Sequence, residues 1–188
     1  MYTLHSALFV RNFIVKLRAV LKDYTSIDTI QSTKYVVIDN ASAISIKQGR
    51  GDFLVKSLQK SIASCSKGDT PFFVMAEGAQ IDDGGHDNDM EFVVRELLDF
   101  DQAVGEAIKF VDSNRETLLI VTADHETGGL TLLGGDISKG YVHGNFSTND
   151  HTAVMVPVFA YGPGAEAFRG VYQNAEIFFK IKQVLNVK

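Results

Sequence analysis

Short apolar runs alternate with longer stretches of helical hydrophobic spacing along this chain. The runs are rich in β-branched and aromatic residues, which favour strands, and they cover residues 35–38, 72–76, 118–122 and 154–161. Pro157 indicates an edge or a bulge in the last run, because proline cannot donate to a strand ladder. Strands that alternate with helices predict an α/β fold with a largely parallel sheet.

Three helices are predicted from apolar positions three or four residues apart. The first follows Asp52, which we expect to cap it. The second extends over residues 90–111, and the third starts at Asn174. The apolar stripe of the second helix consists of Val93, Val94, Leu97, Leu98, Val104, Ile108 and Val111.

The remaining segments have weaker patterns. Residues 7–21 are apolar around much of a helical circumference, and we interpret them as a helix that covers an open face of the sheet. Residues 128–152 are rich in Gly, Asp, Ser and Asn, which indicates a loop or small insertion. We therefore divide the chain into residues 1–50, with one strand and the covering helix, and a main domain over residues 51–188.

Composition and charge exclude several classes of protein. The chain is 45% hydrophobic and 22% charged, as in ordinary globular proteins. Its net charge of −5 argues against nucleic-acid binding, but not against a phosphate ester, since bound metal ions reverse the local charge of a site. No apolar run reaches the roughly 18 residues of a membrane span, so we expect no membrane partner. Cys65 is the only cysteine, which excludes an internal disulfide.

Carboxylates and histidines gather directly after two of the predicted strands and just before another. They are Glu77, Asp82, His86, Asp124, His125 and His151. Carboxylate oxygens and imidazole nitrogens together suit zinc, whereas carboxylates with water or hydroxyls suit magnesium. In open α/β sheets, functional sites lie just beyond the carboxyl ends of strands. These residues therefore predict a metal site at one end of the sheet.

The spacing of these residues bears on how they would bind. Asp82 and His86 lie four residues apart around a glycine pair, so a turn or the start of a helix aims both at one ion. Asp124 and His125 are adjacent, and they converge on an ion only in irregular backbone, which the following glycines allow. Two zinc ions about 4 Å apart would hold the attacking and leaving oxygens of an in-line phosphoryl displacement.

Each residue taken singly has a plainer interpretation. A lone Asp–His pair is most often a solvated turn, Glu77 an exposed charge at a strand end, and His151 a loop histidine. The other acids and histidines of this region, which we interpret as caps, surface acids or residues without ligand-type neighbours, are Asp83, Asp87, Asp89, His5 and His143. Two clusters that each follow a predicted strand favour the metal site.

Three motifs in these clusters resemble the alkaline phosphatase family. Glu77-Gly-Ala-Gln-Ile-Asp82 with His86 resembles that family's Glu-Gly-x-x-Ile-Asp-x-x-x-His segment. Thr122-Ala-Asp124-His125 resembles its Thr-Ala-Asp-His motif. His151-Thr152 and the strand that follows resemble its last histidine and last strand. The motifs occur in family order, and the resemblance extends from about residue 52 to the carboxyl terminus.

The resemblance implies a three-layer sandwich with a mostly parallel sheet, of which residues 51–188 form the carboxy-terminal, metal-binding part. Family members hydrolyse phosphate monoesters through a phosphoserine and are mostly exported, which implies a periplasmic or extracellular location. By resemblance, the ligands of the first zinc, which activates water and stabilises the leaving group, are Asp82, His86 and His151. Those of the second zinc, which holds the serine, are Asp124 and His125. Glu77 matches a magnesium ligand.

The chain departs from the family pattern in its amino-terminal part. The bridging aspartate, the nucleophilic Asp-Ser-Ala segment, the hydroxyl ligand of magnesium and the phosphate-binding arginine are not recognised. The nearest match is Asp39-Asn-Ala-Ser42-Ala. We therefore expect no catalytic serine, weak or absent magnesium, little activity of the isolated chain, and either homo-oligomerisation or a separate amino-terminal half as partner. The short spacing from His125 to His151 predicts a small insertion.

Two alternatives remain open. The chain is another enzyme of the alkaline phosphatase superfamily, such as a phosphomutase or phosphodiesterase, or it is a non-catalytic metal-binding or interaction remnant. The Glu-Gly-x-x-Ile-Asp segment favours the phosphatase branch over the first alternative. The unrecognised serine favours the second.

Overall fold

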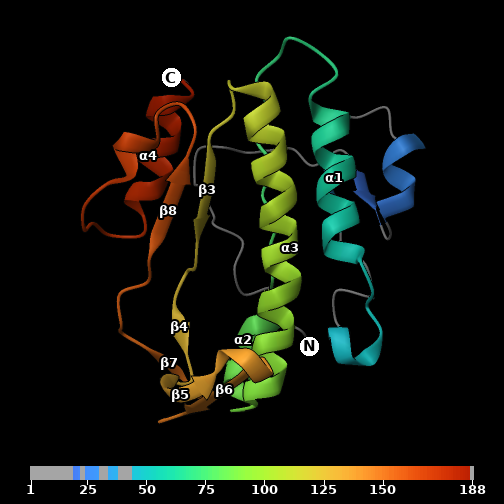
Figure 1. The fold of residues 1–188 in the computed structure, drawn as a ribbon. Helices are drawn as coiled ribbons and strands as arrows, with labels where there is room; N and C mark the ends of the chain where they lie inside the picture. Colours follow the sequence, from blue (N-terminus) through green and yellow to red (C-terminus); the bar gives the residue numbers. More distant parts are fainter. Residues whose placement is uncertain (1–18, 22–23, 30–33, 38–43, 187–188) are drawn as a thin grey trace.

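The computed structural model describes residues 19–21, 24–29, 34–37 and 44–186. Helix α3 (Met90–Asn114) extends along most of the molecule, with α1 (Phe53–Cys65) on one side and strands β3 (Leu119–Thr122) and β8 (Val158–Tyr161) on the other (Figure 1). Helix α4 (Glu176–Val184) lies beyond β8, and the short helix α2 (Gln80–His86) lies against the start of α3.

The other elements are short. The remaining strands are β1 (Ala19–Leu21), β2 (Tyr35–Val37), β4 (Glu126–Thr127), β5 (Thr131–Asp136), β6 (Tyr141–Asn145) and β7 (His151–Thr152). Four 3-10 turns complete the described part, η1 (Tyr24–Thr29), η3 (Ile46–Gln48), η4 (Ile137–Lys139) and η5 (Ala165–Phe168). None of the helices in this part of the chain is long and apolar enough to cross a membrane.

The predicted, mostly parallel sheet is not confirmed in the described residues. Their strands form four separate pairs: β1–β2 is parallel, whereas β3–β8, β4–β7 and β5–β6 are antiparallel. The expected strand over residues 72–76 is wrong, because this segment forms no strand ladder. Apolar content favours a strand, but a strand forms only where a partner backbone offers hydrogen bonds. Phe73 and Met75 are accordingly 61% and 62% exposed.

The three helices predicted after residue 51 are confirmed, with small shifts at their ends. Helix α1 follows Asp52, although the Asp52 side chain makes no capping hydrogen bond. Helix α3 begins where expected, and the carboxylate of Asp89 caps it by accepting from the Phe92 N–H at 3.0 Å. Helix α4 begins two residues after Asn174.

The main core lies between α1 and α3. Leu54 and Leu58 of α1 pack against Ala103 and Ala107 of α3. A second apolar face of α3 lies outside this contact, where Leu97 and Ile108 are 50% and 39% exposed. Together with β3 and β8, that second face encloses a hollow of about 410 Å³ lined largely by apolar side chains. The described residues therefore cover the side of α3 toward β3 and β8 only in part.

A buried ion cluster ties the segment before α1 to α3. Arg50 contacts Glu96 and lies 2.9 Å from an Asp99 oxygen, and all three side chains are less than 10% exposed. Glu96 also accepts from the Ile46 N–H at 2.7 Å, and the other end of the Arg50 guanidinium donates to the Ile44 carbonyl. Such a cluster is stable only with its charges paired.

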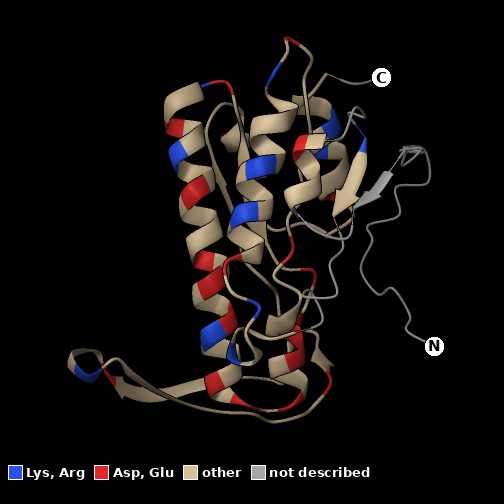
Figure 2. Cartoon of the chain, turned by 90° about the vertical axis from the view of Figure 1, so that its right-hand side faces the viewer, with Lys and Arg blue, Asp and Glu red and all other residues tan. Residues whose placement is uncertain are grey.

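Residues 128–152, predicted as a loop or small insertion, contain a β-hairpin formed by β5 and β6 with η4 at its tip. The loop interpretation is therefore wrong for this part, although the insertion is small. Figure 2 shows the hairpin standing away from the body of the molecule. Leu132 and Leu133 are 65% and 58% exposed, and Ile137 at the tip is fully exposed.

Two sequence predictions fall largely outside the described residues. Residues 7–18 of the proposed covering helix are among those not described, and the last three residues of that range, Ala19–Leu21, form strand β1 instead. The Asp39 to Ser42 segment is also outside the described part. The strand expected over residues 35–38 is present as β2.

Candidate metal centre

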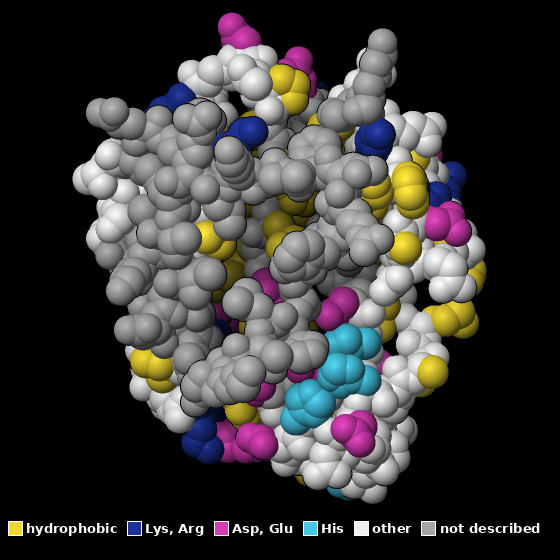
Figure 3. All heavy atoms as spheres, turned by 180° about the vertical axis from the view of Figure 1, so that it is seen from behind, with side chains coloured by type: hydrophobic (Ala, Val, Ile, Leu, Met, Phe, Trp, Pro, Cys, Tyr) yellow, Lys and Arg dark blue, Asp and Glu magenta, His cyan; other side chains and the backbone are white. Residues whose placement is uncertain are grey.

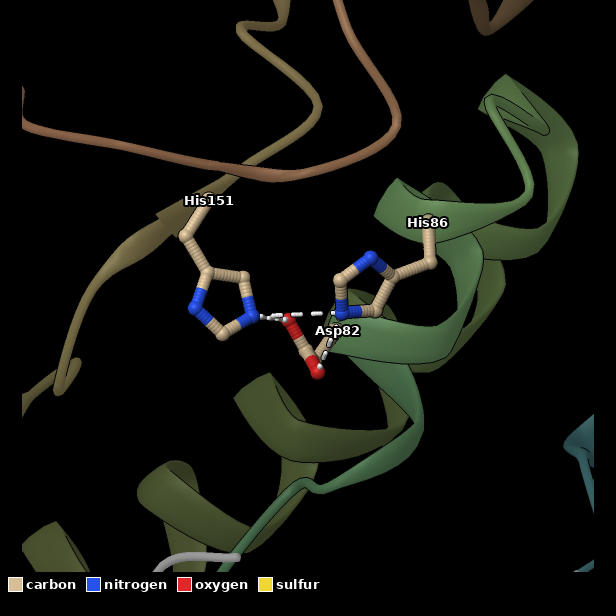
Figure 4. Close-up of side chains that lie close together, drawn as sticks. All are labelled: Asp82, His86 and His151. Atoms are coloured by element: carbon tan, nitrogen blue, oxygen red, sulfur yellow. Dashed lines mark hydrogen bonds and ion pairs between the residues drawn. The ribbon is translucent and has the colours of Figure 1, made fainter.

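Helix α2 and strand β7 bring three of the predicted ligands together. The Nε2 atoms of His86 and His151 are 3.2 Å apart. Asp82 Oδ2 lies 3.2 Å from His86 Nε2, and Asp82 Oδ1 lies 3.7 Å from His151 Nε2. Figure 4 shows the three side chains pointing toward one another, with Asp82 and His86 on the helix and His151 opposite them.

Close packing of α2 on β4 sets this arrangement. Asp82 and His86 are four residues apart and therefore lie on the same face of α2. Gly85 between them is buried, and a Cβ atom there would lie 2.9 Å from the Cβ of Thr127 on β4. Only glycine allows this approach without a shift of the backbone. Gly85 of the sequence motif thus brings the helix against the strand that pairs with β7.

The orientation of the His86 ring is fixed by the backbone. Its Nδ1 lies 2.5 Å from the Asn149 carbonyl oxygen. A carbonyl only accepts, so Nδ1 carries the proton and the Nε2 lone pair faces Asp82 and His151. This hydrogen bond, helped by the charges of Asp82, Asp83 and Asp150 and opposed by desolvation, raises the pKa of His86 above its ordinary value.

The spacing of the donor atoms fits a small tetrahedral cation. One carboxylate oxygen and two imidazole nitrogens lie within 4.8 Å of one another. The Nε2 atoms are 3.2 Å apart, Asp82 Oδ2 is 3.2 Å from His86, and Asp82 Oδ1 is 3.7 Å from His151. Ligands at about 2.0–2.1 Å from a tetrahedral zinc are about 3.3 Å apart. The remaining corner faces solvent, since the three side chains are 37–47% exposed. This open position is typical of a catalytic rather than a structural site.

Thr127 connects the cluster to His125. Its hydroxyl donates to Asp82 Oδ1, and its oxygen lies 3.2 Å from His125 Nδ1. Because the Thr127 hydroxyl proton is donated to Asp82, the contact with His125 is one in which His125 Nδ1–H donates to the Thr127 oxygen. This leaves His125 Nε2 facing Asp124 Oδ2 at 3.3 Å. Asp124 and His125 thus form a second, incomplete pair of donors.

His125 lies directly beside the cluster. Its ring stacks on that of His151, with centroids 3.5 Å apart and planes inclined by 17°. Its Nδ1 is 3.9 Å from Asp82 Oδ1. Seen from behind, histidine side chains form one continuous patch at the surface with acidic side chains next to it (Figure 3). The two donor sets are therefore neighbours on an accessible face.

The other sequence candidates are not members of this donor group. Glu77 is exposed in the segment before α2, and no group of metal-spaced donors within the described ranges includes it. Asp89 is a helix cap, as interpreted, and Asp83 accepts from Gln80 at 2.7 Å. Burial and the neighbouring Asp82 raise the pKa of Asp83. His143 lies on β6, outside the donor group.

Four residues that support the site were not singled out from the sequence. Thr127 and Asn149 each contact a predicted ligand, as described above. Glu126 accepts from the Thr152 hydroxyl and from two backbone N–H groups. Burial alone would raise the Glu126 pKa, but these hydrogen bonds outweigh it and lower the pKa. The available signal was the Glu-Thr-Gly-Gly sequence directly after His125.

Comparisons with known proteins agree with the motifs. The family model described as alkaline phosphatase matches residues 52–145, which is half of the chain. Alkaline phosphatase 4 of Bacillus subtilis is 31% identical over 180 residues that include 58% of this chain and 39% of its own length.

Solved structures give the same result. The alkaline phosphatase of the Antarctic bacterium TAB5 superposes with a TM-score of 0.75 at 40% identity, over 88% of this chain and 50% of that one. A mutant of that enzyme with magnesium bound in its M3 site superposes with a TM-score of 0.74 at 39% identity, over the same shares of both chains. This chain thus spans half or less of the length of these relatives. The 188-residue chain belongs to the alkaline phosphatase family.

Proposed function

We propose that Asp82, His86 and His151 bind a zinc ion and that this chain supplies the metal centre of a phosphate monoester hydrolase. The observation that carries the proposal is the convergence of one carboxylate and two Nε2 atoms at tetrahedral spacing. Membership of the alkaline phosphatase family gives the reaction class. Zinc would supply Lewis acidity toward a phosphoryl oxygen.

The side chains themselves prepare the site for a phosphate. Asp82 is held by the Thr127 hydroxyl, and His86 is held in one tautomer by the Asn149 carbonyl. One carboxylate and two neutral imidazoles leave a bound divalent cation with a net charge of about +1. This local positive charge attracts a phosphate ester to a chain whose overall net charge is −5.

Asp124 and His125 are proposed to bind a second, weaker zinc. They offer two donors instead of three, and Asp124 is 58% exposed. Glu77 is proposed to contribute to a magnesium site that is weak or absent in this chain, since it lies outside the donor group. Titration with zinc therefore gives one tight and one weak binding event.

The 188-residue chain alone is proposed to have little activity. No segment of its sequence is recognised as the family's nucleophilic serine segment, and loss of a nucleophile typically costs several orders of magnitude in turnover. The missing nucleophile would come from an amino-terminal half. Either that half or an additional copy of the chain would cover the face of α3 where Leu97 and Ile108 are 50% and 39% exposed.

A chimera tests the proposal. The half of the TAB5 enzyme that this chain does not match is fused to residues 52–188, and hydrolysis of p-nitrophenyl phosphate is measured with and without zinc. We expect zinc-dependent hydrolysis that is lost in the His86→Ala chimera and retained in the His143→Ala chimera. A folded, zinc-loaded chimera without activity, or one that is equally active after His86→Ala, contradicts the proposal and favours the non-catalytic alternative.

A further inference from the structure

Glu126 follows the predicted ligand His125, but its own carboxylate points elsewhere. One oxygen accepts from the Gly129 N–H at 3.2 Å and from the Thr152 hydroxyl, and the other accepts from the Leu130 N–H at 3.0 Å. Thr152 comes directly after His151 and faces Glu126 across the β4–β7 pair. One carboxylate therefore holds both the turn after β4 and the strand that carries His151.

The same turn also supports the loop that orients His86. The Gly128 N–H donates to the Asp150 carbonyl at 3.0 Å, and the Gly128 carbonyl accepts from the Ser147 N–H at 2.9 Å. These two bonds close the loop that contains Asn149, whose carbonyl accepts from His86 Nδ1. A displacement of the turn would therefore move the loop and release the His86 ring.

The ladder between β4 and β7 is too short to hold this turn by itself. Strands β4 and β7 are each only two residues long, far shorter than a ladder that is stable in isolation. Gly128 and Gly129 have φ angles of +87° and +59°. Glycine adopts this left-handed conformation readily, but many other backbone conformations are equally accessible to it. The three hydrogen bonds of Glu126 select one of these conformations.

We propose that Glu126 is a positioning residue of the metal centre. Its carboxylate fixes β7 through Thr152 and fixes the glycine turn, so that the imidazoles of His151 and His86 meet at one ion. The proposal rests on the proposed metal-binding function, because Glu126 acts on ligands and touches neither metal nor substrate. Charge-assisted hydrogen bonds of this kind are about twice as strong as neutral ones.

A plain structural role for Glu126 predicts a different behaviour. A carboxylate that only stabilised the β4–β7 pair would change the unfolding of the metal-free chain and leave the affinity of the folded chain for zinc unchanged. A positioning residue changes the affinity and also the geometry of the bound ion. The experiment must therefore measure the zinc affinity and the geometry of the bound ion in variants that are folded.

The first measurement is zinc affinity in the full 188-residue chain, by competition with a chelator. The variants are Glu126→Gln, Glu126→Asp and Glu126→Ala, with Glu116→Gln, an exposed acid after α3, as the matched control. Gln keeps the reach and one acceptor oxygen, whereas Asp is one methylene too short to reach Thr152. We expect affinity to fall about 10-fold for Gln and up to about 100-fold for Asp and Ala. The control should bind as the unmodified chain does.

The second measurement tests whether Glu126 acts through its hydrogen bond with Thr152. Thr152→Val removes the hydroxyl but keeps the shape, and it also carries the test if Glu126→Ala does not fold. Thr152→Val should weaken zinc binding several-fold. The double variant with Glu126→Gln should lose less binding free energy than the sum of the two single losses, because both substitutions disrupt the same hydrogen bond. Cobalt then replaces zinc, since its visible spectrum reports ligand number and geometry. At saturation the spectra of Thr152→Val and Glu126→Gln should differ from that of the unmodified chain.

The outcomes distinguish this inference from the proposed function. If the unmodified chain binds no zinc tightly, the proposed function is wrong and Glu126 has nothing to position. If the unmodified chain binds zinc, but the folded Glu126 and Thr152 variants bind it equally well with the same cobalt spectrum, the proposed function stands and the positioning role is overturned.

Discussion

The Nε2 atoms of His86 and His151 lie 3.2 Å apart although 65 residues separate them in the chain. The Nδ1 of His86 is engaged with the Asn149 carbonyl, so the two Nε2 atoms face each other with Asp82 beside them. The lone pair of His86 Nε2 therefore faces His151 Nε2, so a proton on His151 or a cation lies between the two nitrogens. A divalent cation would satisfy both nitrogens and the Asp82 carboxylate at once.

Loss of one histidine of this pair should abolish tight zinc binding. His151→Ala removes a proposed direct ligand, so affinity should fall by more than the roughly 10–100-fold that loss of a supporting residue costs. His143→Ala on β6 is the control, because His143 lies outside the donor group. Isothermal titration of both variants is the check. Unchanged zinc affinity in the His151 variant would remove this residue from the site.

The protonation of His86 should make zinc binding depend on pH. Its pKa is raised, chiefly by the hydrogen bond to the Asn149 carbonyl. In the metal-free chain, the stability from this raised pKa is therefore fully present below the unfolded value of about 6.5 and is lost as the pH rises through the folded pKa. Zinc competes with the proton that binds His86 Nε2 at low pH, so zinc affinity should increase over that pH range. An NMR titration of the metal-free chain checks the pKa, and a value at or below 6.5 contradicts the account.

Breaking the buried ion cluster, which contains none of the proposed metal ligands, should lower the free energy of unfolding. Arg50→Met leaves Glu96 and Asp99 buried without a counter-charge, which typically costs about 3–5 kcal/mol. Lys47→Met is the matched control, because the Lys47–Glu91 pair spans 3.9 Å and both side chains are more than half exposed. Surface pairs of this kind contribute about 0–1 kcal/mol. Urea unfolding measures both, and equal effects would show that the cluster is not the anchor of this segment.

The exposed apolar faces should make the isolated chain self-associate. Ile137 is fully exposed at the hairpin tip, and Phe159 of β8 is 65% exposed beside the hollow on α3. Sedimentation should therefore give a mass above the 20.6 kDa of one chain. Ile137→Lys tests the hairpin tip and Phe159→Lys tests the face beside the hollow. Only the substitution that lies in the self-association interface should shift the chain toward monomer. A monomer at high concentration without either substitution contradicts this prediction.

The sequence predicted the local parts of the site because they depend on spacing within one element. Asp82 and His86 share a helical face at a separation of four residues, and α1, α3 and α4 follow from hydrophobic periodicity. The glycines after His125 were expected to bend the chain, and both have positive φ. These features need no knowledge of distant residues.

The parts that were wrong or missed depend on distant partners. The direction of β8 relative to β3 and the absence of a ladder at residues 72–76 are decided by which strands meet, which apolar content does not encode. The β5–β6 hairpin was not predicted because its polar residues and glycines also favour loops. The contacts of Thr127 and Glu126 to residues 45 and 26 positions away carry no local signal.

A zinc-soaked crystal of the 188-residue chain, measured with anomalous diffraction at the zinc edge, tests the central claim most directly. The account predicts one dominant anomalous peak about 2.0–2.2 Å from His86 Nε2, His151 Nε2 and an Asp82 oxygen. A weaker second peak between Asp124 and His125 is compatible with it. No peak among the first three residues, or a dominant peak at Asp124 and His125 instead, would contradict the account.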